Sequence, residues 1–162
     1  MFEIDHRFML PPSLRITRRY VSERGSTASV WDLRIAQPNV SHLSMTAIHS
    51  LEHFLGSLLP QRSPAIINVA PMGCQTGFYI VTIDMDDFDC LAGHLSEVFS
   101  SVQKATEVPL ANNRQCGWAE NHSLIGAKDV AGWLLSRRAE WRTASSIPIA
   151  GEAEGDTPTR RE

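Results

Sequence analysis

The spacing of apolar residues changes along this chain, and that change limits the folds open to it. Apolar residues recur every third or fourth position, as in a helix with one buried face, over residues 45–59, 87–106 and 123–140. They alternate, or are β-branched and aromatic, as in strands, over residues 27–35, 65–70 and 76–83. Because strands come early and only helices come late, we expect an α+β fold with a mainly antiparallel sheet packed by helices.

Local signals mark where several of these elements end. Ser123 is suited to cap the last helix at its N-terminus. Pro60 and Pro109 follow the first two helices, so we expect each helix to stop before its proline. Gly73 and Gly77 stand on either side of a cysteine and predict an irregular turn between two strands.

Length and composition favour one domain followed by a tail. The chain has 162 residues, of which 43% are hydrophobic and 20% charged, as in ordinary globular proteins. We assign residues 1–142 to one domain and residues 143–162, rich in Ser, Pro, Gly and Glu, to a flexible tail. A net charge of −3 argues against a nucleic-acid partner, and the short apolar runs argue against a membrane span.

The expected location is the cytoplasm. The acidic N-terminus lacks the layout of a secretory signal. Three widely spaced cysteines are an odd number and do not make a disulfide framework. In a reducing compartment these thiols are free to act as ligand, nucleophile or base.

The most informative short motif is H-x-x-E-H, formed by His49, Glu52 and His53. On the predicted helix the two imidazoles lie one turn apart on one face and can bind one metal ion. Glu52 lies beside them as a candidate proton carrier. The alternative is a pair of surface histidines near a glutamate. The motif also occurs in inverzincin metallopeptidases, which need a distant glutamate as third ligand and are generally larger.

Each cysteine has a chemical and a structural interpretation. Cys116 can complete a His2Cys ligand set with an open fourth position, or it can be a small buried residue. Cys74, between glycines, can be presented at a sharp turn as a reactive thiol, or it can be structural. Cys90 lies in the second predicted helix without polar neighbours in the sequence, and we assign it a structural role.

Five short motifs follow one another along the chain, and together they are far more specific than any one of them. They are D-H at 5–6, D-L-R with Q-P-N at 32–39, I-H-S-L-E-H at 48–53, P-M-G-C-Q-T-G-F-Y at 71–79 and Q-C-G at 115–117. In this order and at about these separations, the chain resembles the S-ribosylhomocysteine lyase (LuxS) family from residue 5 to about residue 135. Only the tail is left outside the resemblance.

The resemblance implies an activity and an assembly. It implies a homodimer with two active sites at the subunit interface, and a small molecule as the substrate. It implies one divalent metal ion per subunit, ferrous iron in the native state with zinc or cobalt as alternatives, held by His49, His53 and Cys116. The reaction would cleave the thioether of S-ribosylhomocysteine to homocysteine and dihydroxypentanedione. The second product is the precursor of a quorum-sensing autoinducer, and the reaction belongs to the methyl cycle.

The resemblance also implies roles for single residues. Glu52 and Cys74 would be the catalytic acid–base pair for carbonyl migration and β-elimination, while the metal acts as a Lewis acid. The positions that match substrate-binding residues are His6, Arg34, Asn68, Val69 and Gly117. From the sequence alone, Arg34 can equally form a surface ion pair with Asp32, which would contribute little stability.

Several positions depart from the family pattern. The chain has Met1 instead of a serine, Ala36 instead of a cysteine, Asn68 instead of an aspartate, and Pro60-Gln61 near an expected arginine that Arg62 could replace. If the position of Asn68 faces the ammonium group of the substrate, an amide in place of a carboxylate weakens substrate binding by about 1 kcal/mol or more.

Two lyase hypotheses therefore remain open. One is an S-ribosylhomocysteine lyase in which several substrate-binding residues differ from the family pattern. The other is a divergent relative that applies the same chemistry to another sugar or thioether. A non-catalytic metal-binding protein is a more remote alternative, because it would have little need for Glu52 and Cys74.

Overall fold

The computed structural model describes residues 6–143 and confirms an α+β fold. Met1 and most of the predicted tail, residues 144–162, lie outside this range, so the predicted domain boundary stays a prediction. The elements in chain order are η1 (His6–Phe8), β1 (Ser13–Val21), β2 (Thr27–Arg34), α1 (Met45–Arg62), β3 (Ile66–Pro71), β4 (Gly77–Ile83), α2 (Phe88–Lys104), α3 (Leu124–Ser136) and α4 (Glu140–Thr143). Within the described part of the chain, no helix is both long enough and apolar enough to cross a membrane.

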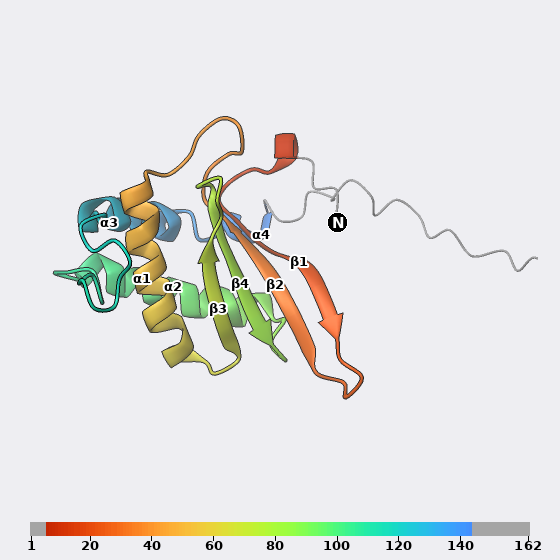
Figure 1. The fold of residues 1–162 in the computed structure, drawn as a ribbon. Helices are drawn as coiled ribbons and strands as arrows, with labels where there is room; N and C mark the ends of the chain where they lie inside the picture. The colour runs from red at the N-terminus through yellow and green to blue at the C-terminus, as the bar shows by residue number, and fades with distance from the viewer. Residues whose placement is uncertain (1–5, 144–162) are drawn as a thin grey trace, which may run out of the picture.

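The four strands form one antiparallel sheet in the order β1-β2-β4-β3 (Figure 1). The central pair places Leu33 of β2 opposite Phe78 of β4, so segments more than forty residues apart lie side by side. Helix α1 packs beside the edge strand β3, and α2 and α3 pack against α1 and each other. This arrangement leaves the turn between β3 and β4 at one end of the sheet.

The hydrophobic core lies between one face of the sheet and the helices. On β2, Trp31 and Leu33 are buried, as the alternation predicted, and they join Leu51 of α1 and Phe99 of α2 in one cluster. Burial of each such side chain contributes about 1.5–3 kcal/mol. The polar face of β2 is buried as well, since Asp32 and Arg34 are almost inaccessible to solvent.

The three predicted helices are present, and Ser123 caps α3 by accepting a hydrogen bond from the Gly126 amide at 3.0 Å. The expectation that α1 stops before Pro60 is wrong, because the helix runs on to Arg62. Pro60 removes one backbone donor, but the last turn is still held by the Ser63 amide, which donates to the Leu59 carbonyl at 3.3 Å. The helical pattern expected to reach residue 140 is divided between α3 and α4.

Strand β1 was not predicted from the sequence. It is an edge strand with a bulge between Ile16 and Arg18, and its second half is exposed. Arg15, Arg18 and Arg19 interrupt the apolar alternation, as charged residues commonly do on the edges of sheets. The pattern on which strand prediction depends is therefore weak in this segment.

Candidate active site

Four side chains that can bind a metal ion lie close together between α1 and the segment that leads into α3. One ligand atom from each of His49, His53, Cys116 and His122 lies within 4.8 Å of the other three. The sequence predicted the first three members of this cluster and missed His122. We call these four residues the metal cluster.

Hydrogen bonds fix which nitrogen of His49 and His53 is free to bind a metal. Nδ1 of His49 lies 2.9 Å from the Asn121 carbonyl, and Nδ1 of His53 lies 2.7 Å from the Pro109 carbonyl. A carbonyl oxygen can only accept, so each Nδ1 carries the proton and each Nε2 keeps a free lone pair. Metal-ligating histidines are typically oriented in this way.

The buried hydroxyl of Ser50 orients His122. It donates to the Thr46 carbonyl at 2.8 Å, so it must accept from the Ser123 amide at 2.8 Å and from Nδ1 of His122 at 3.2 Å. Nε2 of His122 is then free and lies 3.4 Å from the Cys116 sulfur. Burial, together with the nearby His49 and His53, lowers the pKa of His122 and favours its neutral, ligating form.

The donor set of the metal cluster fits a divalent transition metal. Imidazole nitrogens and a cysteine thiolate are borderline-soft ligands, which suit zinc, iron or cobalt. The sequence contained one clue to His122, which lies six residues after Cys116 and directly before the N-cap Ser123. This position does not by itself indicate a metal ligand, because polar residues are common beside a helix N-cap.

Glu52 lies on α1 next to His53 and is half-buried. Among residues 6–143, no hydrogen bond or ion pair engages its carboxylate. The side chain is thus available to exchange a proton close to the metal cluster, although it is not a member of that cluster. Its role as a proton carrier stays a prediction.

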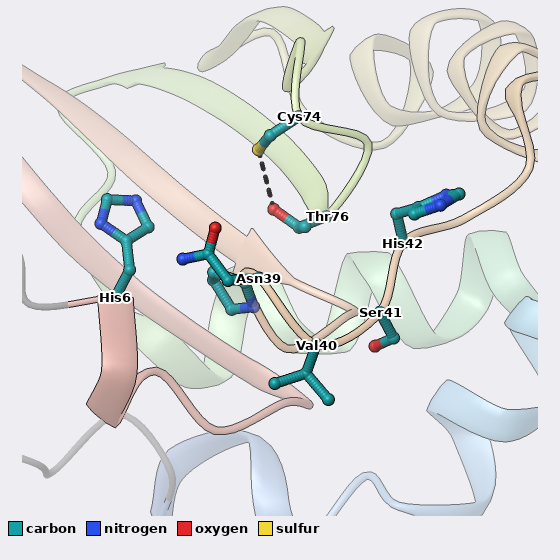
Figure 2. Close-up of a pocket in the computed structure, with 8 residues that line it drawn as sticks. His6, Asn39, Val40, Ser41, His42, Cys74 and Thr76 are labelled. Carbon is teal, nitrogen blue, oxygen red and sulfur yellow. Dashed lines mark hydrogen bonds between the residues drawn. The ribbon is translucent and has the colours of Figure 1, made fainter.

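Cys74 lies at the turn between β3 and β4 and is exposed, so its interpretation as a buried structural cysteine is wrong. Its thiol opens into a hollow of about 540 Å³ (Figure 2). The described residues that line this hollow are His6, Pro38, Asn39, Val40, Ser41, His42, Cys74 and Thr76. The lining includes no side chain of the metal cluster, so the two chemical groups occupy separate places in one chain.

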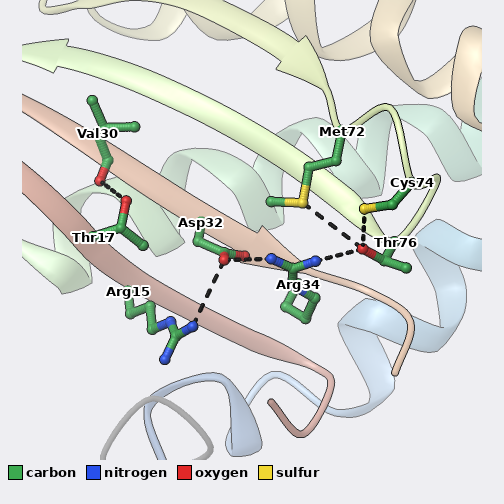
Figure 3. Close-up of polar contacts among 8 residues, drawn as sticks. All are labelled: Arg15, Thr17, Val30, Asp32, Arg34, Met72, Cys74 and Thr76. Carbon is green, nitrogen blue, oxygen red and sulfur yellow. Dashed lines mark hydrogen bonds and ion pairs between the residues drawn. The ribbon is translucent and has the colours of Figure 1, made fainter. Parts of the chain in front are cut away.

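Arg34 lies beneath Cys74 and does not line the hollow. Its guanidinium donates to Asp32 Oδ2 at 2.6 Å and to Thr76 Oγ1, and Thr76 Oγ1 is 2.9 Å from Cys74 Sγ (Figure 3). The alternative of a surface ion pair is wrong, because both partners of the Asp32–Arg34 pair are buried. Partial burial raises the pKa of the Cys74 thiol, but hydrogen bonds from Thr76 and the charge of Arg34 outweigh it, and the pKa is lowered.

The predicted substrate-binding residues fall into separate groups. His6, in η1, lines the hollow that holds Cys74. Gly117 is exposed and directly follows Cys116 of the metal cluster. Asn68 and Val69 lie on β3 beside α1, with Asn68 exposed and Val69 half-buried.

Two further residues discussed from the sequence, Cys90 and Arg62, lie away from both the metal cluster and the hollow. Cys90, to which we assigned a structural role, is exposed, and its sulfur lies 3.6 Å from His94 Nε2 and 3.7 Å from Met85 Sδ, so it does have a polar neighbour. Arg62, considered as a substitute for a missing arginine, forms an ion pair with Glu97 at 3.1 Å. Neither residue lies in the metal cluster or among the lining of the hollow.

The family model and the similar proteins described below all point to the same family. Residues 1–145 match the model of the family described as S-Ribosylhomocysteinase (LuxS). The chain is 40% identical to the S-ribosylhomocysteine lyase of Oceanobacillus iheyensis over 140 residues, which cover 86% of this chain and 92% of that protein. It is 38% identical to the enzyme of the same name from Staphylococcus saprophyticus over 153 residues, 94% of this chain and 95% of that one. The Helicobacter pylori protein of this name is 40% identical over 140 residues, 86% and 90% of the two chains.

Proposed function

The chain belongs to the S-ribosylhomocysteinase (LuxS) family, and from this premise we propose that it cleaves the thioether of S-ribosylhomocysteine to give homocysteine and dihydroxypentanedione. The observation that carries the proposal is the convergence of His49, His53 and Cys116 in such a chain. The methyl cycle and autoinducer formation follow from the family. The cluster contains a cysteine and no glutamate, which argues against the metallopeptidase alternative.

We propose that His49, His53 and Cys116 hold one divalent metal ion per subunit. Ferrous iron is the proposed native ion, with zinc or cobalt as alternatives, in keeping with the mixed imidazole and thiolate donors. When bound, the metal supplies Lewis-acid polarisation of the sugar carbonyl. A catalytic site needs an open coordination position, so we assign three of the four cluster residues as ligands and treat His122 as a neighbour of that position.

The protons are moved by Cys74 and Glu52. Carbonyl migration along the sugar requires removal of a proton from the carbon next to the carbonyl and its return to the neighbouring position. The lowered pKa of Cys74 increases the share of its thiolate form, which is the form that acts as a base. Glu52 is the second proton carrier. After migration, loss of a proton next to the carbonyl expels the homocysteine sulfur by β-elimination, with no hydrolysis.

The complete site requires a second subunit. Cys74 and His6 share a hollow that none of the metal-cluster side chains lines. Large apolar side chains near both groups are exposed, among them Phe8 at 59%, Val40 at 79% and Trp118 at 61%. We propose a homodimer in which the metal cluster of one subunit faces Cys74 of the other, so that burial of these side chains stabilises the pair.

The direct test of this function is thiol release. The full chain, loaded anaerobically with ferrous iron, is expected to release homocysteine from S-ribosylhomocysteine, detected with a chromogenic thiol reagent. Cys74→Ala and Glu52→Gln are each expected to lower the rate about 10²–10⁴-fold, the usual effect of removing a general base or acid. Cys90→Ser is the matched control and is expected to keep full activity. No release from folded, metal-loaded protein would favour the divergent relative with another thioether substrate.

A further inference from the structure

A buried, positively charged group lies beneath Cys74. Arg34 and Asp32 have side chains 2% and 1% exposed and are joined at 2.6 Å, and Arg15, 11% exposed, lies 3.8 Å from the same carboxylate oxygen. Two guanidiniums and one carboxylate leave one unbalanced positive charge. Buried charge of one sign is costly unless an opposite charge or aligned hydrogen bonds offset it. An anion close to this group would provide that compensation.

Thr76 is the link between this charge and the Cys74 sulfur. A guanidinium can only donate, so Thr76 Oγ1 accepts from Arg34 and still has one proton to give. Two sulfur atoms are within reach, Cys74 Sγ at 2.9 Å and Met72 Sδ at 3.9 Å. The shorter contact directs the proton to Cys74. A hydrogen bond donated to the sulfur stabilises the thiolate more than the thiol.

We propose that Thr76 is a positioning residue that holds the Cys74 sulfur as a thiolate facing the hollow, because its hydroxyl connects this sulfur to Arg34 of the buried group, whose net charge is positive. The inference rests on the proposed function, because it names the source of the base that function needs. Thr76 is 3% exposed and lies beside Gly77 at the start of β4, so its hydroxyl is held in place by the sheet (Figure 3).

The surroundings of Cys74 agree with an anionic sulfur. Arg34 of β2 donates to Thr76, which contacts the sulfur, and His6 of η1 and His42 of the loop before α1 line the same hollow. No aspartate or glutamate is among the described residues that line the hollow. The lowered pKa of Cys74 has the direction that this arrangement requires.

The test measures the reactivity of the thiol and does not need turnover. Metal-loaded protein is alkylated with iodoacetamide over a range of pH, and modification of the Cys74 peptide is followed by mass spectrometry, which separates it from exposed Cys90. Thr76→Val removes the hydroxyl and keeps the shape. We expect its rate at pH 7 to fall about tenfold, the effect of losing one hydrogen bond to a charged acceptor, and its pH profile to move to higher pH.

Two variants make the comparison specific. Thr76→Ser keeps the hydroxyl and is expected to react as the wild type does. Thr17→Val removes a threonine hydroxyl from β1 of the same sheet, where it donates to the Val30 carbonyl at 3.2 Å, and is expected to leave Cys74 reactivity unchanged. If Thr76→Val does not fold, Thr76→Ala against Thr76→Ser makes the same comparison.

Full reactivity at pH 7 in the variants that lack the Thr76 hydroxyl would overturn the inference. So would an equal loss in Thr17→Val, because the effect would then belong to the sheet as a whole. Failure of this test would leave thiol release from S-ribosylhomocysteine untouched. Failure of the proposed function would appear as absent release from a protein whose Cys74 still reacts as expected.

Discussion

His122 lies in the metal cluster but differs from the other two histidines in how it is held. Its Nδ1 bonds to a serine hydroxyl, whereas those of His49 and His53 bond to backbone carbonyls. A hydroxyl that already accepts from the Ser123 amide is a weaker acceptor, and we expect His122 to be dispensable for holding the metal.

This expectation is tested by metal content. His53→Gln is expected to lose the metal after dialysis, while His122→Gln retains about one ion per chain, because three ligands suffice at a catalytic site. His94→Gln, a histidine on α2 outside the cluster, is the control. Elemental analysis of the purified chains decides the matter. Loss of metal from His122→Gln equal to that from His53→Gln would mean a closed site with four protein ligands.

Asn68 is the second residue whose chemistry can be tested on its own. It lies exposed on β3, beside the helix that carries Glu52. Asn68→Asp would restore a charge-assisted bond to a substrate ammonium, and we expect KM for S-ribosylhomocysteine to fall about fivefold. Gln61→Glu makes the same charge change at an exposed position of α1 and is expected to leave KM unchanged. A higher KM in Asn68→Asp would contradict the role assigned to this position.

At the scale of elements, the turn from β3 into β4 determines where Cys74 is presented. Gly77 begins β4 opposite Arg34, and a Cβ there would collide with the Leu33 carbonyl of β2. We expect Gly77→Ala to lower the free energy of unfolding by about 1–3 kcal/mol, because the two strands must separate.

Gly93→Ala on α2 is the matched control for this change. A Cβ at Gly93 meets nothing within 4 Å, so the substitution is expected to raise the free energy of unfolding by about 0.5–1 kcal/mol. Urea unfolding of the three proteins measures both effects. A Gly77→Ala protein as stable as the wild type would show that the strands do not approach as closely as described.

The elements that the sequence predicted well are those with a strong period. The alternation around Trp31 and Leu33 and the helical spacing through Leu51 both follow directly from burial on one face. Strand β1 was missed because charged residues break its alternation. The end of α1 was predicted before Pro60, but the helix continues to Arg62. A proline in the last turn removes only one backbone hydrogen bond, and the sequence pattern does not show that the helix tolerates this loss.

The candidate site was predictable where one short segment holds the information. His49 and His53 share a helix face, so their spacing alone indicates a metal. His122 depends on Ser50, seventy-two residues away, and the burial of Arg34 depends on a neighbouring strand that was not predicted. Contacts of this kind arise only once the chain is folded, and no local pattern encodes them.

At the scale of the whole molecule, we propose that the metal cluster and Cys74 of one chain work with those of a second chain. Substrate chemistry needs the metal cluster and Cys74 within reach of one small molecule. In a single chain, however, the hollow around Cys74 is lined by none of the cluster residues. A symmetric dimer makes two shared sites from one pair of surfaces.

The central claim, that each active site joins the metal cluster of one subunit to Cys74 of the other, is tested most directly with heterodimers purified by two different tags. Pairing a His53→Gln chain with a Cys74→Ala chain leaves one shared site intact, and we predict about half the wild-type rate of thiol release. Pairing a chain that carries both substitutions with a wild-type chain damages both shared sites, and we predict almost none. The reverse result, activity only in the second heterodimer, would place each site within a single chain and contradict the account.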